Sequence, residues 1–199
     1  MSLKLKFENI GARLGLKIKV LLTDGSQPIG NGIGPRLEAK DVFAVLAQEA
    51  NRPLDLEKKA ILLASNILEM AGKAKKGQGQ KMAQEMLKSK MAFAQFSKII
   101  EAQGGDLINL DKKLKLAEFS FTFTANKSGV VKEISNKKMA SIAFSAGCPA
   151  DKGAGIYLYV HHSHKVKKGD PLATLYAETK QKLGFAKKTY NSIQPITLS

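Results

Sequence analysis

The spacing of hydrophobic residues changes along the chain, from a helical period in its first half to an alternating period in its second. Between positions 35 and 102, apolar residues recur at intervals of three and four, which is typical of amphipathic helices. Proline favours the first turn of a helix and glycine its end, so these residues divide the stretch into segments. The pattern predicts helices over residues 35–49, 54–70, 80–88 and 91–102, and the last turns of an earlier helix over residues 7–14.

A run of hydrophobic residues precedes the first of these proline-led helices. Residues 16–22 read Leu-Lys-Ile-Lys-Val-Leu-Leu, which predicts a strand of a parallel sheet with a polar edge at Lys17 and Lys19. A parallel sheet needs neighbouring strands and the crossovers that connect them. We therefore expect the chain to begin inside a larger α/β unit.

Past residue 115 the hydrophobic pattern alternates. Residues 118–124 read Glu-Phe-Ser-Phe-Thr-Phe-Thr, so the Phe side chains share one face of a predicted strand, which is expected to be buried. Further strands are predicted over residues 130–134, 155–160 and 170–176, and a helix capped by Asn136 is predicted to run to Ala146.

The two patterns predict a fold of mixed α/β class with two domains. Residues 1–110 are expected to form part of a large α/β domain, with one strand and several helices. Residues 116–199 are expected to form a small α+β domain. The boundary is placed in the lysine-rich stretch 109–115, where neither pattern is strong.

The composition indicates an ordinary globular protein with a large positive charge. The net charge is +15, but the lysines come in scattered pairs, and no aromatic platform or zinc-finger spacing accompanies them. No apolar window is long enough to cross a membrane, and no secretory signal precedes the first helix. The lone Cys148 agrees with a reducing compartment. We therefore expect a cytoplasmic protein without a nucleic-acid or membrane partner.

Three histidines lie close together, at His161, His162 and His164. Imidazoles are common ligands of zinc, nickel and copper. Adjacent residues at a strand end point to opposite faces, however, and no further Cys or His completes a site. A polar turn is the preferred interpretation, and a metal site is the alternative.

A glycine-rich segment, residues 23–35, lies between the predicted strand and the first proline-led helix. It reads TDGSQPIGNGIGP. Its glycines can adopt positive φ or admit a close neighbour, and the helix start that follows has free N–H groups that favour anions. The segment matches neither the dinucleotide-binding fingerprint nor the phosphate-binding P-loop. Glycine spacing alone leaves a sharp turn and a binding site as open alternatives.

The same segment resembles a signature of the thymidine and pyrimidine-nucleoside phosphorylases. The resemblance continues in order through residues 99–106, 151–156 and 166–172. The sequence of these segments is most similar to the branch that includes the archaeal AMP phosphorylases. Family members are more than twice as long as this chain. The resemblance therefore implies the carboxy-terminal portion of such an enzyme, with residues 1–110 as the end of its α/β domain.

The resemblance implies a pentosyltransferase of pyrimidine nucleoside salvage that converts thymidine and phosphate to thymine and 2-deoxyribose 1-phosphate. The alternatives are an AMP or nucleoside-monophosphate phosphorylase of the same family and a non-catalytic interaction module. The family's phosphate loop and nucleoside-binding residues do not occur in this sequence, so no catalytic residue is assigned here and the isolated chain is expected to be inactive. The full-length enzyme is expected to be a homodimer that requires no cofactor.

By motif position, the resemblance implies that Thr23, Asp24 and Ser26 border the substrate pocket. They would lie at the carboxyl end of a strand, where α/β sheets bind their ligands. Short polar side chains in such a loop also form local hydrogen bonds, and a purely loop-fixing role is the alternative.

The resemblance also implies a structural potassium ion in the intact enzyme. Its ligands would include the backbone carbonyls of Ile29 and Gly32 and the carboxylate of Asp41, a position where pyrimidine-nucleoside members have glutamate. Hard oxygen ligands suit such a cation. The remaining ligands are expected upstream of this chain.

Overall fold

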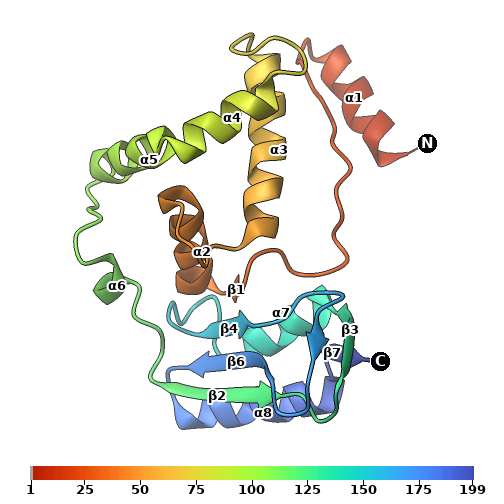
Figure 1. Cartoon of the computed structure of the whole chain (residues 1–199), viewed down its shortest axis with the longest axis vertical. Coiled ribbons are helices and arrows are strands. Elements are labelled where there is room, and N and C mark those ends of the chain that lie inside the picture. Colours follow the sequence, from red (N-terminus) through yellow and green to blue (C-terminus); the bar gives the residue numbers. More distant parts are fainter. Residues whose placement is uncertain (1) are drawn as a thin grey trace.

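The chain forms a helical part followed by a smaller unit of strands and helices (Figure 1). The structure is a computed structural model that describes residues 2–199, apart from the side chain of Asp111. Among these residues, no helix has the length and apolar character needed to cross a membrane. The helices of the first part are α1 (Leu3–Arg13), α2 (Pro35–Ala47), α3 (Leu54–Met70), α4 (Gly79–Lys88), α5 (Met91–Ala102) and α6 (Leu110–Lys113).

The predicted helices of the first part are confirmed. α3 and α5 begin and end at the predicted residues: Pro53 precedes α3, and a glycine with positive φ follows each helix, Gly72 after α3 and Gly104 after α5. Pro35 opens α2, where its missing N–H has no intrahelical partner to lose. Gly72, with φ of 68°, follows α3 in the left-handed conformation that ends many helices.

The strand predicted at residues 16–22 is not present. This segment has no strand pairing, and within residues 2–199 the structure shows no backbone hydrogen bond made by residues 17–22. A β-strand exists only where a neighbouring strand pairs with it. The described chain brings no strand beside this segment, which therefore runs in an open path between α1 and β1 (Figure 1).

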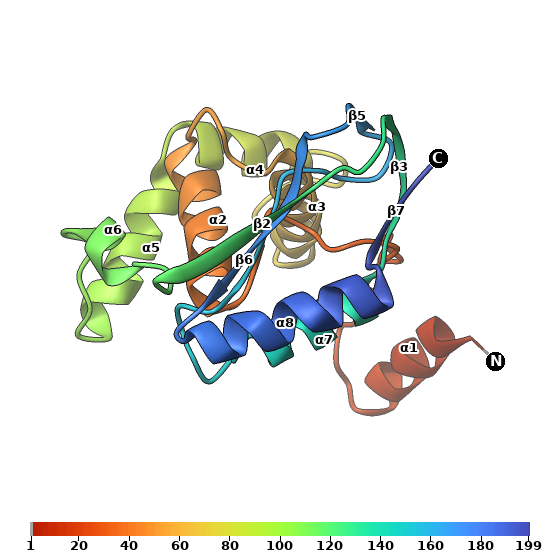
Figure 2. The ribbon, with the colours of Figure 1, turned by 90° about the horizontal axis from the view of Figure 1, so that it is seen from below.

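The second unit consists of two antiparallel sheets and two helices. One sheet has the strand order β1-β4-β6-β2 and the other β5-β3-β7. The helices α7 and α8 lie together beneath the larger sheet (Figure 2). The strands are β1 (Gly32–Ile33), β2 (Phe119–Thr124), β3 (Gly129–Ile134), β4 (Gly155–Leu158), β5 (Lys165–Val166), β6 (Pro171–Ala177) and β7 (Ile196–Leu198), and the helices are α7 (Asn136–Ser145) and α8 (Lys180–Ile193).

Strand β1 links the two parts of the chain. It precedes α2 in sequence, yet Gly32 pairs with Tyr157 and Ile33 pairs with Ile156 of β4. The mixed fold and the small carboxy-terminal α+β unit are confirmed. The division between residues 110 and 116 stays a prediction, and β1 is a strand from before it that belongs to the sheet after it.

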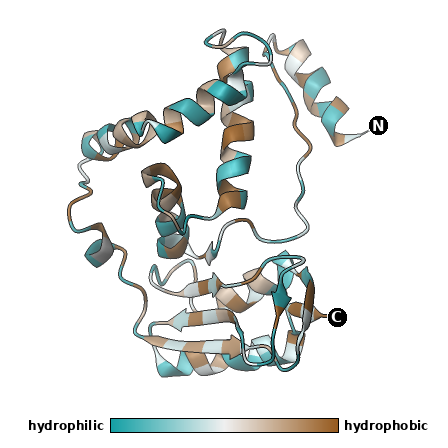
Figure 3. Cartoon of the chain, viewed as in Figure 1, coloured by the Kyte–Doolittle hydropathy of each residue, from teal (hydrophilic) through white to brown (hydrophobic). Residues whose placement is uncertain are grey.

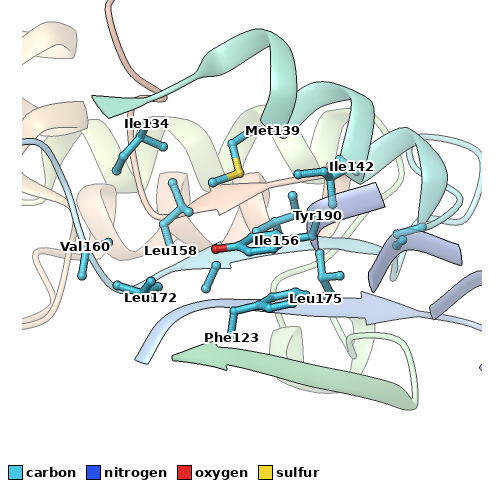
Figure 4. Packing of buried hydrophobic residues seen from close by; sticks show 14 of the residues in the cluster. Phe123, Ile134, Met139, Ile142, Ile156, Leu158, Val160, Leu172, Leu175 and Tyr190 are labelled. Atoms are coloured by element: carbon cyan, nitrogen blue, oxygen red, sulfur yellow. The ribbon is translucent and has the colours of Figure 1, made fainter. Parts of the chain in front are cut away.

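The core of the second unit lies between the larger sheet and the helix pair (Figure 4). Phe123 of β2 stacks on Tyr190 of α8 with ring centroids 3.5 Å apart. The other two Phe side chains of β2 are less buried than the alternation predicts, because β2 ends the sheet. The Nζ of Lys187 lies 3.5 Å from the ring centroid of Phe121 and covers part of it.

The helix α8 was not predicted, although the sequence contains a signal for it. Leu183, Ala186, Tyr190 and Ile193 follow one another at intervals of three and four and pack on the core. Lysines surround these residues and Gly184 interrupts them, which hides the helical period in the sequence.

Candidate functional site

The carboxylate of Asp41 holds the centre of the glycine-rich segment. Its Oδ2 accepts hydrogen bonds from the backbone N–H groups of Asn31, at 2.6 Å, and Gly32, at 2.7 Å. Only 7% of Asp41 is exposed. Burial raises the pKa of this carboxyl above its usual value, against the opposite effect of the two backbone hydrogen bonds. The segment is thus fixed to α2 by a buried acid.

A second carboxylate fixes the same segment to α3. Asp55, in the first turn of α3, accepts a hydrogen bond from the N–H of Gly30 at 3.0 Å. Gly30 has φ of 74°, and a Cβ there would lie 2.6 Å from Oδ2 of Asp41. Both the conformation and the close carboxylate therefore require glycine at this position.

The third anchor is His161, just beyond β4. Its Nε2 lies 2.9 Å from Oδ1 of Asn31, which assigns the ring proton to Nε2. Its Nδ1 is buried without a hydrogen-bond partner, 4.0 Å from Oδ2 of Asp55. Burial lowers the pKa of His161, although the charge of Asp55 opposes this effect. A neutral imidazole therefore joins the glycine-rich segment to the carboxy-terminal unit.

The histidines do not gather around a metal site. Among the residues that the structure describes, no group of three or more His, Cys, Asp or Glu side chains could hold a metal ion. His162 contributes its backbone N–H, which donates to Oε1 of Gln27 at 2.7 Å, and Ser163 has positive φ. The polar-turn interpretation agrees with these contacts.

The start of the glycine-rich segment forms a local turn. Oδ1 of Asp24 accepts a hydrogen bond from the N–H of Ser26 at 2.9 Å, which lowers the pKa of Asp24. Nδ2 of Asn136 donates to the carbonyl of Gly25 at 2.7 Å. Asn136 is the first residue of α7, whose cap is Ser135, so the predicted capping role of Asn136 is wrong.

Two of the three predicted pocket-border residues line a cavity. Thr23 and Asp24 border a cavity of about 340 Å³ together with Lys58 and Lys59 of α3. Ser26 is not among the lining residues. Asp55 also lines this cavity, so the two lysines face two carboxylates and the lining is polar without an excess of positive charge.

The three predicted potassium ligands border a different cavity. Ile29, Gly32 and Asp41 line a cavity of about 500 Å³ between the loop, α2 and α7. Carbonyl and carboxylate oxygens are the hard ligands that such a cation takes, and Glu38 adds another carboxylate to the lining. Oδ2 of Asp41 already accepts two N–H groups, and the potassium site stays a prediction.

Several structural partners of the loop were not identified from the sequence, among them Asp55, His161 and Asn136. Each lies far from the loop along the chain and reaches it through the fold. Asp55 has a weak local signal, because an acidic residue in the first turn of a helix can accept backbone N–H groups there. No local pattern indicates that His161 faces Asn31.

Comparison with known proteins finds one matching domain family and several similar proteins. The pyrimidine nucleoside phosphorylase C-terminal domain family matches residues 130–196, which include β3, α7, β4, β6 and α8. These are the elements that enclose the core of the second unit.

Individual relatives extend the similarity over nearly the whole chain. A protein named "Putative thymidine phosphorylase" from Legionella pneumophila (strain Paris) is 45% identical over 186 residues, which are 94% of this chain and 35% of that protein. An "AMP phosphorylase" from Thermococcus kodakarensis is 43% identical over 197 residues, 99% of this chain and 39% of that protein. An "AMP phosphorylase" from Methanococcus aeolicus is 41% identical over 189 residues, 93% of this chain and 37% of that protein.

The chain thus spans 35 to 39% of the length of these relatives. Residues 130–196 match the model of the pyrimidine nucleoside phosphorylase C-terminal domain, and the chain is similar over most of its length to proteins named putative thymidine phosphorylase and AMP phosphorylase.

Proposed function

We propose that this chain serves as the carboxy-terminal part of a thymidine phosphorylase, which converts thymidine and phosphate to thymine and 2-deoxyribose 1-phosphate. The observation that carries the proposal is the 45% identity with the Legionella protein over 94% of the chain, a span that includes the glycine-rich segment. The proposed setting is a cytoplasmic enzyme of pyrimidine nucleoside salvage that acts as a homodimer.

Phosphorolysis breaks the bond between the anomeric carbon and the base and joins that carbon to a phosphate oxygen. The enzyme must hold the phosphate beside the sugar and stabilise charge on the sugar and the departing base. In this proposal, the chain contributes a wall of the pocket at Thr23, Asp24 and Ser26. The groups that bind phosphate and nucleoside lie in the portion of the relatives that this chain does not match, so the isolated chain is inactive.

A potassium ion is part of the proposal. Ile29, Gly32 and Asp41 would supply three of its oxygen ligands, and the cavity that all three border supports this role. The ion would brace the loop between α2 and the pocket and takes no part in bond breaking. No other cofactor is needed.

A second candidate function is phosphorolysis of AMP or another nucleoside monophosphate. The specific observation in its favour is the 43% identity with the Thermococcus protein, which extends over 99% of the chain.

Two chimeric enzymes test the proposal. In one, this chain replaces the matching region of the Legionella protein, and in the other it replaces that of the Thermococcus protein. Each chimera, each intact host and the isolated chain are assayed for phosphate-dependent release of base from thymidine and from AMP. We expect turnover of thymidine in the Legionella chimera and none in the isolated chain.

The outcomes separate the candidates. The second candidate would be favoured if only the Thermococcus chimera were active and if it released base from AMP but not from thymidine. Folded chimeras that are inactive beside active hosts would contradict both and favour a non-catalytic interaction module. Turnover by the isolated chain would show that the catalytic groups lie within it.

The potassium site is tested by comparing turnover in potassium chloride and tetramethylammonium chloride, with Asp41→Glu expected to keep the potassium dependence and Asp41→Asn to lose it.

A further inference from the structure

A cavity of about 460 Å³ lies in the carboxy-terminal unit, where the end of α8 meets the turn after β2 and the strand β7. Its floor is made by Phe123, Leu172 and Tyr190, each at most 8% exposed. Figure 3 shows hydrophobic positions on β2 and mostly hydrophilic ones on α8, two of the elements that meet at this cavity. A cavity of this size with a buried, largely apolar floor and a few polar groups around it has the build of a small-molecule site.

The hydroxyl of Tyr190 has no hydrogen-bond partner. Within the residues that the structure describes, no hydrogen bond involves this hydroxyl, and burial alone raises its pKa. The hydroxyl is not sealed inside the core, because Nδ1 of His161 is the one fully buried side-chain polar atom among those residues that lacks a partner. In Figure 4 the hydroxyl oxygen lies toward Leu172, which lines the same cavity. A largely buried hydroxyl without a partner is unfavourable, and a ligand atom in the cavity would supply the missing hydrogen bond.

The rim of the cavity carries a positive charge that no carboxylate in the lining balances. Lys127, in the turn after β2, lines the cavity, and no Asp or Glu is among the lining residues. Glu133 lies opposite Thr197 across β3 and β7, but it is outside the lining. Lys127 also makes no ion pair within the described part of the chain. Three exposed side-chain amides that are free of hydrogen bonds within that part complete the rim, those of Asn126, Asn191 and Gln194.

We propose that this cavity binds a small carboxylic acid that has an apolar body and a second hydrogen-bonding group. Lys127 and the rim amides hold the carboxylate, since an ammonium group and N–H donors together favour an anion. The apolar body lies on the floor, and the hydroxyl of Tyr190 bonds the second polar group. A cationic ligand does not fit, because the lining offers it no carboxylate. No residue of the glycine-rich segment lines this cavity, so the proposal does not depend on the proposed function.

The test is titration of the full, isotope-labelled chain with para-hydroxyphenylacetate, followed by two-dimensional NMR. Two matched probes each lack one feature of this acid: para-hydroxyphenylacetamide lacks the charge, and phenylacetate lacks the second polar group. We expect para-hydroxyphenylacetate to shift the signals of the rim residues and to bind about tenfold more tightly than its amide, because it alone pairs with an ammonium group.

Two variants of the cavity assign these contacts to side chains. Lys127→Gln is expected to remove the preference for the acid over the amide. Tyr190→Phe keeps the ring that stacks on Phe123 and deletes only the hydroxyl. It is expected to remove the advantage of para-hydroxyphenylacetate over phenylacetate and to leave the affinity for phenylacetate unchanged.

Lys98→Gln is the matched control, because it removes the same charge from an exposed position on α5, outside the lining of the cavity. It is expected to leave all three affinities unchanged. The proposal would be overturned if none of the probes bound, if the acid and its amide bound equally, or if the shifts were confined to residues outside the cavity. Equal weakening by Lys98→Gln and Lys127→Gln would also overturn it, since the preference would then reflect only the overall charge of the chain.

Discussion

Asp41 accepts two backbone hydrogen bonds from residues nine and ten positions before it, in a place almost closed to water. Asp41→Ala would leave both N–H groups without an acceptor, and we expect the free energy of unfolding to fall by about 1–3 kcal/mol. Asp41→Asn keeps an oxygen in the same place and should lose less. Urea unfolding followed by circular dichroism measures both changes.

The control for Asp41 is Asp24→Ala. Asp24 also accepts a backbone hydrogen bond, from Ser26, but it lies in an exposed turn where water can replace the lost acceptor. We expect little change in unfolding for this variant. If Asp41→Ala unfolded at the same urea concentration as the unchanged chain, the anchoring role of Asp41 would be excluded.

The role of a single residue could be predicted where the sequence around it indicates that role. Asp41 lies in α2, six residues after the glycine-rich segment ends at Pro35, and the resemblance singled it out. His161 acts through a contact with Asn31 that spans 130 positions, and only the fold brings them together. The lack of a hydrogen-bond partner for its Nδ1 results from burial, and the residue type alone does not show whether a side chain is buried.

The short strand β1 joins the helical part to the carboxy-terminal sheet, and Gly34 lies at its end. Gly34 has φ of 128°, and a Cβ there would lie 2.6 Å from the carbonyl oxygen of Ala154. We expect Gly34→Ala to lower the free energy of unfolding by about 2 kcal/mol or more, because backbone strain and the clash add. Thermal unfolding followed by circular dichroism measures the loss.

Substitutions at two other glycines distinguish the effect of backbone strain from the effect of a steric clash. Gly77 has φ of 84° but open space around its Cα, so Gly77→Ala should show strain alone. Gly25 has neither positive φ nor a close neighbour, and Gly25→Ala should be nearly neutral. A ranking in which Gly25→Ala is as harmful as Gly34→Ala would contradict this account of the loop.

Whole elements followed the sequence where local signals agreed with one another. α3 has apolar residues at helical spacing, a proline before it and a glycine after it, and its bounds were predicted correctly. Residues 16–22 have the composition of a strand, but strand formation depends on a neighbour that the described chain does not supply. The prediction failed because strand formation requires a paired neighbour, and the sequence of the segment does not show whether such a neighbour is present.

At the scale of the whole molecule, stability is concentrated in the carboxy-terminal unit. The main core cluster contains residues from β2 onward, with Ile33 of β1 packed against it, and no residue of α1 belongs to it. The segment after α1 is tied to the end of α3 by a hydrogen bond from Nζ of Lys17 to the carbonyl of Met70. The packed core is therefore distinct from α1 and the segment that follows it.

Removing residues 1–22 tests this division. We expect the shortened chain to unfold cooperatively, with a free energy of unfolding within about 1 kcal/mol of that of the full chain, because little buried apolar surface is lost. The matched truncation removes residues 179–199, which include Ala186 and Tyr190 of the core, and should abolish cooperative unfolding. If removal of residues 1–22 also abolished cooperative unfolding, α1 and the segment after it would be part of the folded core, which would contradict this division.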